Sequence, residues 1–441
     1  QIEVLGEAFV GELLVNAGWD LVYDGSRQSV SGTVRLDEKL FDQVNAAGIG
    51  SYVSGHEEAT FRIDLNAPGG IPYQLTSPLT AMNIAIPEIG WRKPAGLPVD
   101  FLVQGRIGSP VTVDQIRLVS PDFEFDGAMR MGSESGRVEE INLRRVRLGD
   151  AYEGPADLTL GADGSLSQIS MPGTLTIADL DMDFSRPDSG PGHPLDVSIG
   201  AIAMADTVSI TGVNGRFGGH ETYDARLVAS LNGTVPIQIG ITQQDNRSRL
   251  VINANDAGGV ARELGLTGNL AGGRLKMDVV YQAGQDAYTG NIQINDMTAR
   301  KMPLILELLS VIAVTGLVDQ LSSGGISFSE VRGQFTLTPE LLTIKDGSAN
   351  SSSIGFTARG TYDLTDRTMN IRGSMTPNVY VDFVLNTIIP IGRLVGQREG
   401  EQLGTIRYSI SGPAESPTIE SNALTILSPI GSGDFDANDN N

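Results

Sequence analysis

The fold is decided by residues 354–375, which read IGFTARGTYDLTDRTMNIRGSM. Apolar and small residues alternate with polar ones over 354–362, and they alternate again over 369–375. A period of two is typical of a strand with one apolar and one wet face. Residues 364–367 (LTDR) separate the two runs and are suited to a turn. The stretch therefore predicts an antiparallel hairpin.

An apolar helix is predicted upstream, over Leu304–Leu321. Pro303 precedes it, and proline suits the first helical position because its missing N–H would be unpaired there. Apolar residues recur at helical spacing on one face and also occupy other positions, so the polar face is thin. We expect this helix to be covered on most sides, either as an ordinary core helix or as a cap on the end of the sheet.

The rest of the chain repeats the strand pattern. Short alternating runs follow one another between about 99 and 185 and again from 208 to 294, separated by glycine, aspartate or proline. This spacing favours an antiparallel sheet over βαβ units. Short helices are expected over Leu36–Val44 and near Val260–Leu264. We interpret residues 186–194 as an insertion and 431–441 as a disordered tail.

Composition excludes several classes of function. The formal net charge is −22, which repels phosphate backbones and therefore excludes nucleic-acid binding. The same charge argues against a broad electrostatic hold on anionic lipid headgroups, so membrane contact should be local and hydrophobic. There is no cysteine, and His56, His193 and His220 lack metal-ligand spacing. No phosphate loop or dinucleotide fingerprint occurs either, so we expect no enzymatic activity, no cofactor and no metal.

No membrane-spanning segment is visible. The longest apolar run, Leu304–Val318, contains Glu307 and is too short to cross a bilayer. The chain opens at Gln1 and not at methionine, so we expect a processed or truncated form whose inner-membrane anchor has been removed.

An ordered series of short motifs between residues 256 and 430 resembles the C-terminal region of AsmA-like bacterial envelope proteins. The motifs are 256–260 (DAGGV), 308–310 (LLS), 325–328 (GISF), 334–338 (QFTLT), 360–364 (GTYDL), 373–377 (GSMTP), 389–392 (IPIG) and 411–413 (SGP). Two features depart from the family pattern. Its usual C-terminal ending appears here only as Asn422–Thr425, and its N-terminal membrane anchor is absent.

The resemblance implies a long β-groove that bridges two membranes and carries phospholipid. The predicted fold is mainly β: an elongated antiparallel sheet curled into an open apolar groove, with a few short helices and a C-terminal capping helix. Residues 1–255 would form a β-rich groove or repeat region with a short N-terminal helix. Residues 256–430 would form the AsmA-like module, followed by the 431–441 tail.

The strand pattern alone leaves two architectures open, because a sheet must bury its apolar face against something. Two sheets could pack together as a sandwich or a closed solenoid filled by its own side chains. Alternatively, one sheet could curl into a half-pipe lined by acyl chains. Exposing a lipid tail of about 16 carbons costs on the order of 13 kcal/mol at roughly 0.8 kcal/mol per methylene, and a continuous apolar trough would remove most of that cost.

With the resemblance, we expect a periplasmic, inner-membrane-anchored protein of a Gram-negative bacterium that binds phospholipid or another acyl-chain lipid. It would transfer this lipid between the inner and outer membranes, touching a membrane at one or both ends. The predicted groove-lining residues are Phe335, Leu337, Ile354, Phe356, Tyr362, Met369 and Ile371. The predicted membrane or partner contacts are Val381, Phe383, Val384, Leu385, Ile388, Ile389, Ile391 and Leu394.

The alternative is an envelope scaffold or outer-membrane assembly factor whose β core is filled by its own side chains, or which binds a β-strand partner along its edge. A glycan-processing β-solenoid enzyme ranks last, because it would need converging carboxylates that the sequence does not reveal.

Overall fold

A computed structural model shows that the protein is mainly β: of the residues that the structure describes, 75% lie in strands and 3% in helices, and the main sheet is not closed. The expected fold class is confirmed at this level. The described residues are 2–10, 13–24, 27–37, 52–65, 70–86, 91–108, 111–133, 137–176, 194–205, 207–218, 223–244, 247–282, 287–302, 306, 324–377 and 406–422. The chain divides into two compact units, 1–233 with 242–245, and 234–241 with 246–441.

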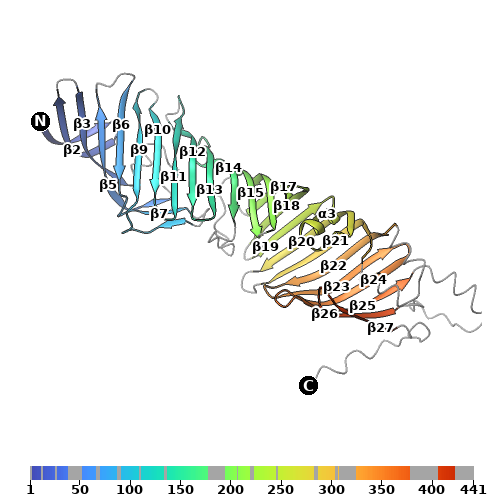
Figure 1. The fold of residues 1–441 in the computed structure, drawn as a ribbon. Helices are drawn as coiled ribbons and strands as arrows, with labels where there is room; N and C mark the ends of the chain where they lie inside the picture. The colour runs from blue at the N-terminus through green and yellow to red at the C-terminus, as the bar shows by residue number, and fades with distance from the viewer. Residues whose placement is uncertain are drawn as a thin grey trace, which may run out of the picture. The chain divides into compact units, whose positions relative to one another are not determined.

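In the first unit, strands pair with their neighbours in chain order (Figure 1). The strands are β1 (Ile2–Val10), β2 (Leu13–Asp24), β3 (Arg27–Asp37), β5 (His56–Asp64), β6 (Ile71–Ser77), β9 (Asp100–Ile107), β10 (Thr112–Val119), β11 (Phe123–Met131), β12 (Val138–Leu148), β13 (Tyr152–Leu160), β14 (Leu166–Thr176), β15 (Leu195–Ala205), β16 (Val208–Phe217) and β17 (Tyr223–Leu231). A separate small sheet contains β4 (Val53–Ser54), β7 (Asn83–Ile86) and β8 (Trp91–Lys93).

The expected helix over Leu36–Val44 is wrong at its first residues. Leu36 and Asp37 complete β3, opposite Glu57 and His56 of β5. Leu36 is only 3% exposed and joins the core, because it continues the apolar alternation of β3. Residues 38–44 lie outside the described residues.

One ladder departs from the antiparallel pattern. β14 and β15 are parallel, with Ile169 opposite Val197 and Met171 opposite Ile199. The described ladders on either side of this pair are antiparallel. The loop expected at 186–194 lies between these two strands, and only its last residue, Pro194, belongs to the described residues. Parallel neighbours need a connection that returns to the same end of the sheet, and sequence alternation does not report strand direction.

In the second unit, antiparallel strands again follow one another in chain order (Figure 1). They are β19 (Arg247–Ala254), β20 (Leu270–Gln282), β21 (Tyr288–Ala299), β22 (Ile326–Leu337), β23 (Leu341–Ser351), β24 (Ile354–Asp363), β25 (Thr368–Pro377), β26 (Ile406–Pro413) and β27 (Thr418–Asn422). The boundary between the units falls within β18 (Val235–Gln244). The sequence-based boundary at residue 255 lies inside the second unit.

The predicted hairpin over residues 354–375 is confirmed. β24 and β25 pair antiparallel with Tyr362 opposite Met369. The Asp363 carboxylate closes the turn by accepting hydrogen bonds from the backbone N–H groups of Thr365 (2.9 Å) and Asp366 (2.8 Å). An aspartate at this position favours a turn because its side chain bonds the backbone two residues further on.

Helix α3 (Ala257–Glu263) agrees with the short helix expected near Val260. Asp256 caps it by accepting a hydrogen bond from the N–H of Gly259 at 2.9 Å. A Cβ on Gly258 would lie 2.5 Å from the carbonyl oxygen of Leu270, so only glycine lets the helix approach β20 this closely. Of the helix expected over 304–321, only Leu306 is described; its N–H donates to the carbonyl of Met302 at 2.9 Å.

Candidate functional site

Strand register gives the second unit one apolar and one polar face, because directly opposite residues project to the same side. Side chains line up in rows that cross the strands at right angles. The middle row consists of Phe335, Ile344, Gly360, Ile371, Ile410 and Ile419. The rim row consists of Tyr281, Tyr288, Leu337, Leu342, Tyr362 and Met369. Both rows lie on the apolar face.

Two further rows complete this face. The core row consists of Val331, Ala349, Phe356, Met375 and Ile406. The small row lies between the core and middle rows and consists of Gly333, Gly347, Ala358, Gly373 and Tyr408. On the opposite face the equivalent rows are polar, for example Thr289, Thr336, Thr343, Thr361, Asn370, Ser411 and Thr418.

The structure places all seven predicted lining residues on this one apolar face. Phe335 and Ile371 belong to the middle row, and Leu337, Tyr362 and Met369 belong to the rim row. Phe356 belongs to the core row, and Ile354 lies two residues before it on the same face of β24. The sequence did not reveal Ile344, Ile410 and Tyr281 as their neighbours, because a period of two identifies faces within a strand but not the register between strands.

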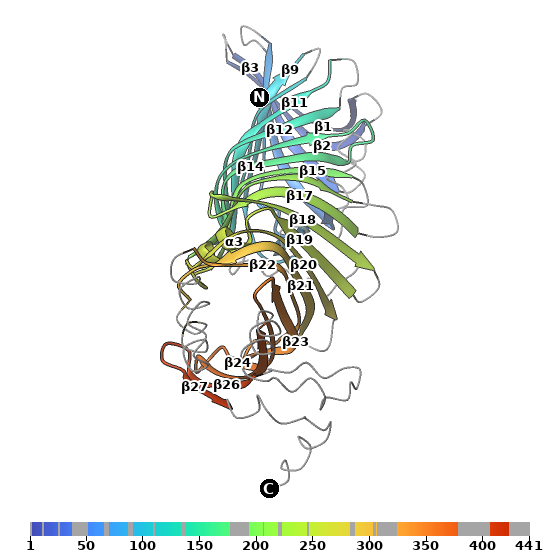
Figure 2. The same ribbon diagram turned by 90° about the vertical axis from the view of Figure 1, so that its right-hand side faces the viewer.

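The apolar face is covered along one border and half-buried along the other. Ile354, Met375, Ile406 and Phe328 are at most 3% exposed and form a closed core with Ala299 and Ile326. α3 packs on the same border, since a Cβ on Gly273 would lie 3.3 Å from the Cβ of Ala257. The rim row is more accessible, and Tyr288 is 45% exposed. Figure 2 shows the sheet of this unit bending from β20 through β23 to β26.

The first unit has a corresponding apolar face. Its long row passes from strand to strand through Val30, Ile63, Tyr73, Gly105, Val113, Met129, Ile141, Leu158, Ile169, Val197, Gly215 and Leu227. The small sheet β4–β7–β8 covers one border of this face, where the rings of Trp91 and Phe123 lie 4.6 Å apart. Beside it, the buried Lys93 ammonium donates to the carbonyl of Met82 at 2.8 Å.

Tyrosine side chains lie against glycines on both apolar faces. The Tyr408 hydroxyl donates to the Thr357 carbonyl at 2.7 Å, and a Cβ on Gly373 would lie 2.6 Å from that hydroxyl. Tyr152 similarly covers Gly154 and Gly173 and donates to the Pro155 carbonyl at 2.5 Å. Tyr73 covers Gly105 and donates to the Thr112 carbonyl at 3.0 Å. This arrangement keeps the apolar face low in relief while satisfying each hydroxyl.

Burial changes the titration of these tyrosines. It raises the pKa of Tyr408 to about 12. It raises the pKa of Tyr73 to about 12 as well, with a further contribution from the charge of Asp114. The pKa of Tyr152 is also raised, chiefly by burial. The neutral phenol is therefore favoured on the apolar face, because ionisation would place a charge in a low-dielectric environment.

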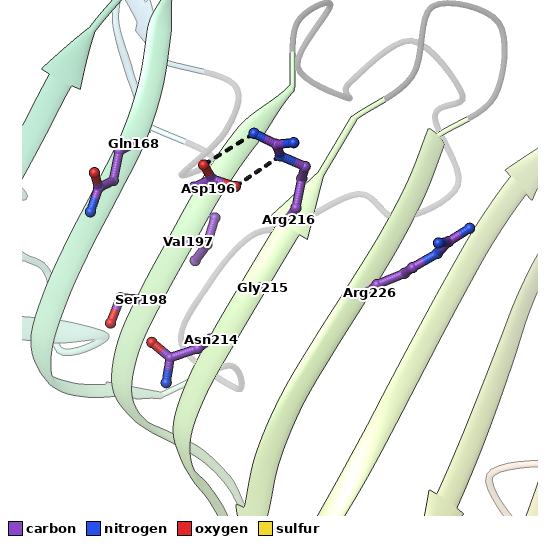
Figure 3. A pocket seen from close by; sticks show the side chains of 8 residues that line it. All are labelled: Gln168, Asp196, Val197, Ser198, Asn214, Gly215, Arg216 and Arg226. Atoms are coloured by element: carbon purple, nitrogen blue, oxygen red, sulfur yellow. Dashed lines mark hydrogen bonds and ion pairs between the residues drawn. The ribbon is translucent and has the colours of Figure 1, made fainter.

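The polar face of the first unit is neutralised by ion pairs. Figure 3 shows Asp196 and Arg216 on neighbouring strands, where Nε of Arg216 donates to Oδ1 of Asp196 at 2.9 Å. Arg226 lies opposite Arg216 on the next strand and is directed away from this pair. Gln168 and Asn214 complete the polar surroundings.

The described part of the chain contains neither a metal-binding cluster nor a membrane-spanning helix. No three histidine, aspartate or glutamate side chains there come together in a way that could hold a metal ion. Nor is any helix within those ranges long and apolar enough to cross a bilayer. The predicted membrane or partner contacts from Val381 to Leu394 lie outside the described residues.

Comparison of the chain with family models, with curated proteins and with solved structures gave no match. The resemblance to the AsmA-like C-terminal region therefore stays a prediction based on the motifs quoted above.

Proposed function

We propose that the apolar faces hold the acyl chains of phospholipid and that the protein passes this lipid between the two membranes of a Gram-negative envelope without chemical conversion. The main support for this proposal is the set of apolar rows in the second unit. The middle row crosses from β22 to β27 and the rim row from β20 to β25, and one border of the face remains half-buried.

Each apolar row crosses several strands in a line, so an extended acyl chain could lie along it. Neighbouring strands lie about 4.8 Å apart, so the middle row, which crosses from β22 to β27, runs for roughly 24 Å across the strands. A chain laid along the middle row would contact Phe335, Ile344 and Ile371 in succession, while its headgroup could remain beyond the rim. Each methylene removed from water would contribute about 0.8 kcal/mol.

The distribution of burial favours bound lipid over a self-filled core. A sheet packed against its own second layer is expected to bury most of its inward-facing apolar residues. Here only Met375 and Ile406 of the core row are buried, whereas its other members and the middle and rim residues keep partial exposure: Val331, Ala349, Phe356, Phe335, Leu337, Tyr362 and Met369. The closed core of the second unit thus accounts for only one border of its apolar face, and a further apolar occupant would complete it.

The choice of phospholipid and of the envelope follows from the AsmA-like motifs. Those at 334–338, 360–364 and 373–377 fall on β22, β24 and β25, the strands that carry the predicted lining. The proposal therefore includes a periplasmic location and an inner-membrane anchor in the full-length protein, with contact to a membrane at one or both ends.

The test is mass spectrometry of an organic extract from protein purified without detergent, with a β-sandwich protein of similar size from the same host as control. We expect phospholipid in stoichiometric amount. Ile371→Asp should reduce it several-fold, because a carboxylate would enter the middle row. The neighbouring Asn370→Asp should not, because Asn370 lies on the polar face.

Photo-crosslinking provides a second, position-resolved readout. A photoreactive residue at Phe356 or Tyr362 should label lipid, whereas one at Thr357 or Thr361 should not, since these neighbours project to the opposite side. An extract no richer in lipid than the control would contradict the proposal and favour the envelope scaffold. Equal labelling from both faces would also contradict it.

A further inference from the structure

The polar face of the second unit contains two arginines that directly oppose each other. Arg359 of β24 lies opposite Arg372 of β25, and both are exposed. Directly opposite residues have their Cβ atoms about 5 Å apart, where like charges are destabilising. Within the described ranges, no carboxylate lies within ion-pair distance of either guanidinium.

The surroundings supply hydrogen-bond donors. Thr357 and Ser374 form the next opposite pair on the same face, and their hydroxyl oxygens lie 2.7 Å apart. On β26, Arg407 lies opposite Ser374, and Ser409 lies opposite Arg372. Three neighbouring strands thus bring three arginines and three hydroxyls together.

Each of the two strands that flank β24, β25 and β26 contains one carboxylate. Asp346 lies at a bulge of β23, opposite Gln334. Glu420 of β27 lies opposite Ser409, one strand beyond Arg372. Neither forms an ion pair with Arg359 or Arg372 among the described residues. The positive charge of the two opposed guanidinium groups is therefore not cancelled locally, although the whole chain has a net charge of −22.

The first unit contains the same arrangement with its charge compensated. Arg216 lies opposite Arg226, but Asp196 on the other neighbouring strand accepts two hydrogen bonds from Arg216, at 2.9 and 3.2 Å (Figure 3). Arg226 also has Asp224 at 3.7 Å. The position equivalent to Asp196, beside Arg372, is occupied by Ser409. The chain can thus neutralise such a pair but does not do so between β24 and β25.

We propose that Arg359 and Arg372, supported by Arg407 and the Thr357 and Ser374 hydroxyls, bind a phosphate group. Two guanidinium forks separated by a strand spacing can each donate to phosphate oxygens, and neighbouring hydroxyls can donate to the remainder. A phosphate would remove the like-charge repulsion that the free protein tolerates. It would come either from solution or from the headgroup of an anionic phospholipid. The site lies on the face opposite the apolar rows, so it does not depend on the function proposed above.

The experiment uses the full chain at low ionic strength, because contacts between exposed charges weaken with added salt. One arm titrates inorganic phosphate by calorimetry. The other measures co-sedimentation with phosphatidylcholine vesicles containing phosphatidylglycerol, against vesicles of phosphatidylcholine alone. The test variant is the double substitution Arg359→Gln and Arg372→Gln. The matched control is Arg216→Gln with Arg226→Gln, which removes the same charge from the first unit.

We expect the test variant to bind at least tenfold more weakly and the control variant to bind like the original protein. Phosphate binding lost only in the test variant supports the proposal with free phosphate as the source. Binding to anionic vesicles alone, again lost only in the test variant, supports it with the headgroup as the source. Equal losses in both variants, or no binding in either arm, would overturn it. The test variant should fold normally, because it removes a repulsion.

Discussion

The two units contain the same kind of sheet, but the first is more completely satisfied by its own side chains. There the small sheet packs on the apolar face through Trp91 and Phe123, and Asp196 neutralises Arg216. In the second unit, Gly333, Gly347 and Ala358 stand side by side in the small row, and Arg359 faces Arg372 without an ion-paired carboxylate among the described residues. This difference is the reason why the acyl-chain and phosphate sites that we propose are argued from the second unit.

The largest expected effect comes from removing the cover of the first unit. Trp91→Ala should destabilise this unit by about 3–5 kcal/mol, because a large buried aromatic would leave a cavity. Trp91 is 7% exposed, whereas Leu97, whose replacement by alanine is the control, is 39% exposed. Urea unfolding followed by circular dichroism measures both. A Trp91→Ala protein as stable as the control would show that the small sheet does not close this core.

Enlarging a small side chain should destabilise the first unit more than the second, with a smaller effect than Trp91→Ala. Ala156 is 4% exposed in the first unit, so Ala156→Leu should cost about 1–3 kcal/mol through overpacking. Ala358 in the small row is only half-buried, so Ala358→Leu should change the free energy of unfolding by less than about 0.5 kcal/mol. The same substitution should lower co-purifying lipid, because the added side chain would rise between the core and middle rows.

Thermal unfolding and lipid extraction of the two variants test this contrast together. If Ala358→Leu proved as destabilising as Ala156→Leu, the small row would already be filled by the protein itself. The two units would then not differ in how completely their own side chains fill the apolar face.

How much of this could be predicted from the sequence differs between strands and sheets. The alternation predicted the series of short strands that includes β9 to β14, and it predicted the hairpin closed by Asp363, because period and turn chemistry are local. The parallel pairing of β14 with β15 was not predictable, since alternation is the same in either direction. Leu36 was assigned to a helix because Leu36, Leu40, Phe41 and Val44 also fit helical spacing.

The candidate face was predicted in part for the same reason. Phe335, Ile354 and Met369 were identified from alternation within their own strands, and register places them on one face. The rows themselves, the rings over Gly373 and Gly154, and the opposition of Arg359 and Arg372 depend on which residues meet across strands. Register is set by the whole sheet and by its bulges, so no local pattern reports it.

The tyrosines that cover glycines should contribute similarly to the stability of both units. Tyr73→Phe and Tyr408→Phe each remove a hydroxyl bonded to a carbonyl, so each should cost about 1 kcal/mol at neutral pH. The exposed Tyr288→Phe is the control and should cost nearly nothing. A loss at Tyr408 alone would show that only the second unit depends on this contact.

Alkaline titration provides an independent check. The folded pKa of Tyr73 and Tyr408 is about 12, above the ordinary value of 10. Burial of the neutral phenol therefore stabilises the fold fully below pH 10, and this stabilisation is lost as pH rises from 10 through 12. Both phenylalanine variants should show a weaker fall in stability over that range. An unchanged slope would contradict the raised pKa values.

The smallest expected effect on stability comes from neutralising Asp196, which makes the opposed arginines of the first unit resemble those of the second. Asp196→Asn would leave Arg216 opposite Arg226 without its bidentate partner, which should cost only about 0.2–1 kcal/mol because Asp196 is 52% exposed at its side chain. The same variant should acquire weak phosphate binding in calorimetry, since Arg216 loses its carboxylate and Arg226 keeps only the longer contact with Asp224, at 3.7 Å. Ser198→Ala, one row along β15, is the control and should acquire none. If Asp196→Asn binds no phosphate while the original protein does, opposed arginines are not sufficient, and the hydroxyls of Thr357 and Ser374 must define the site in the second unit.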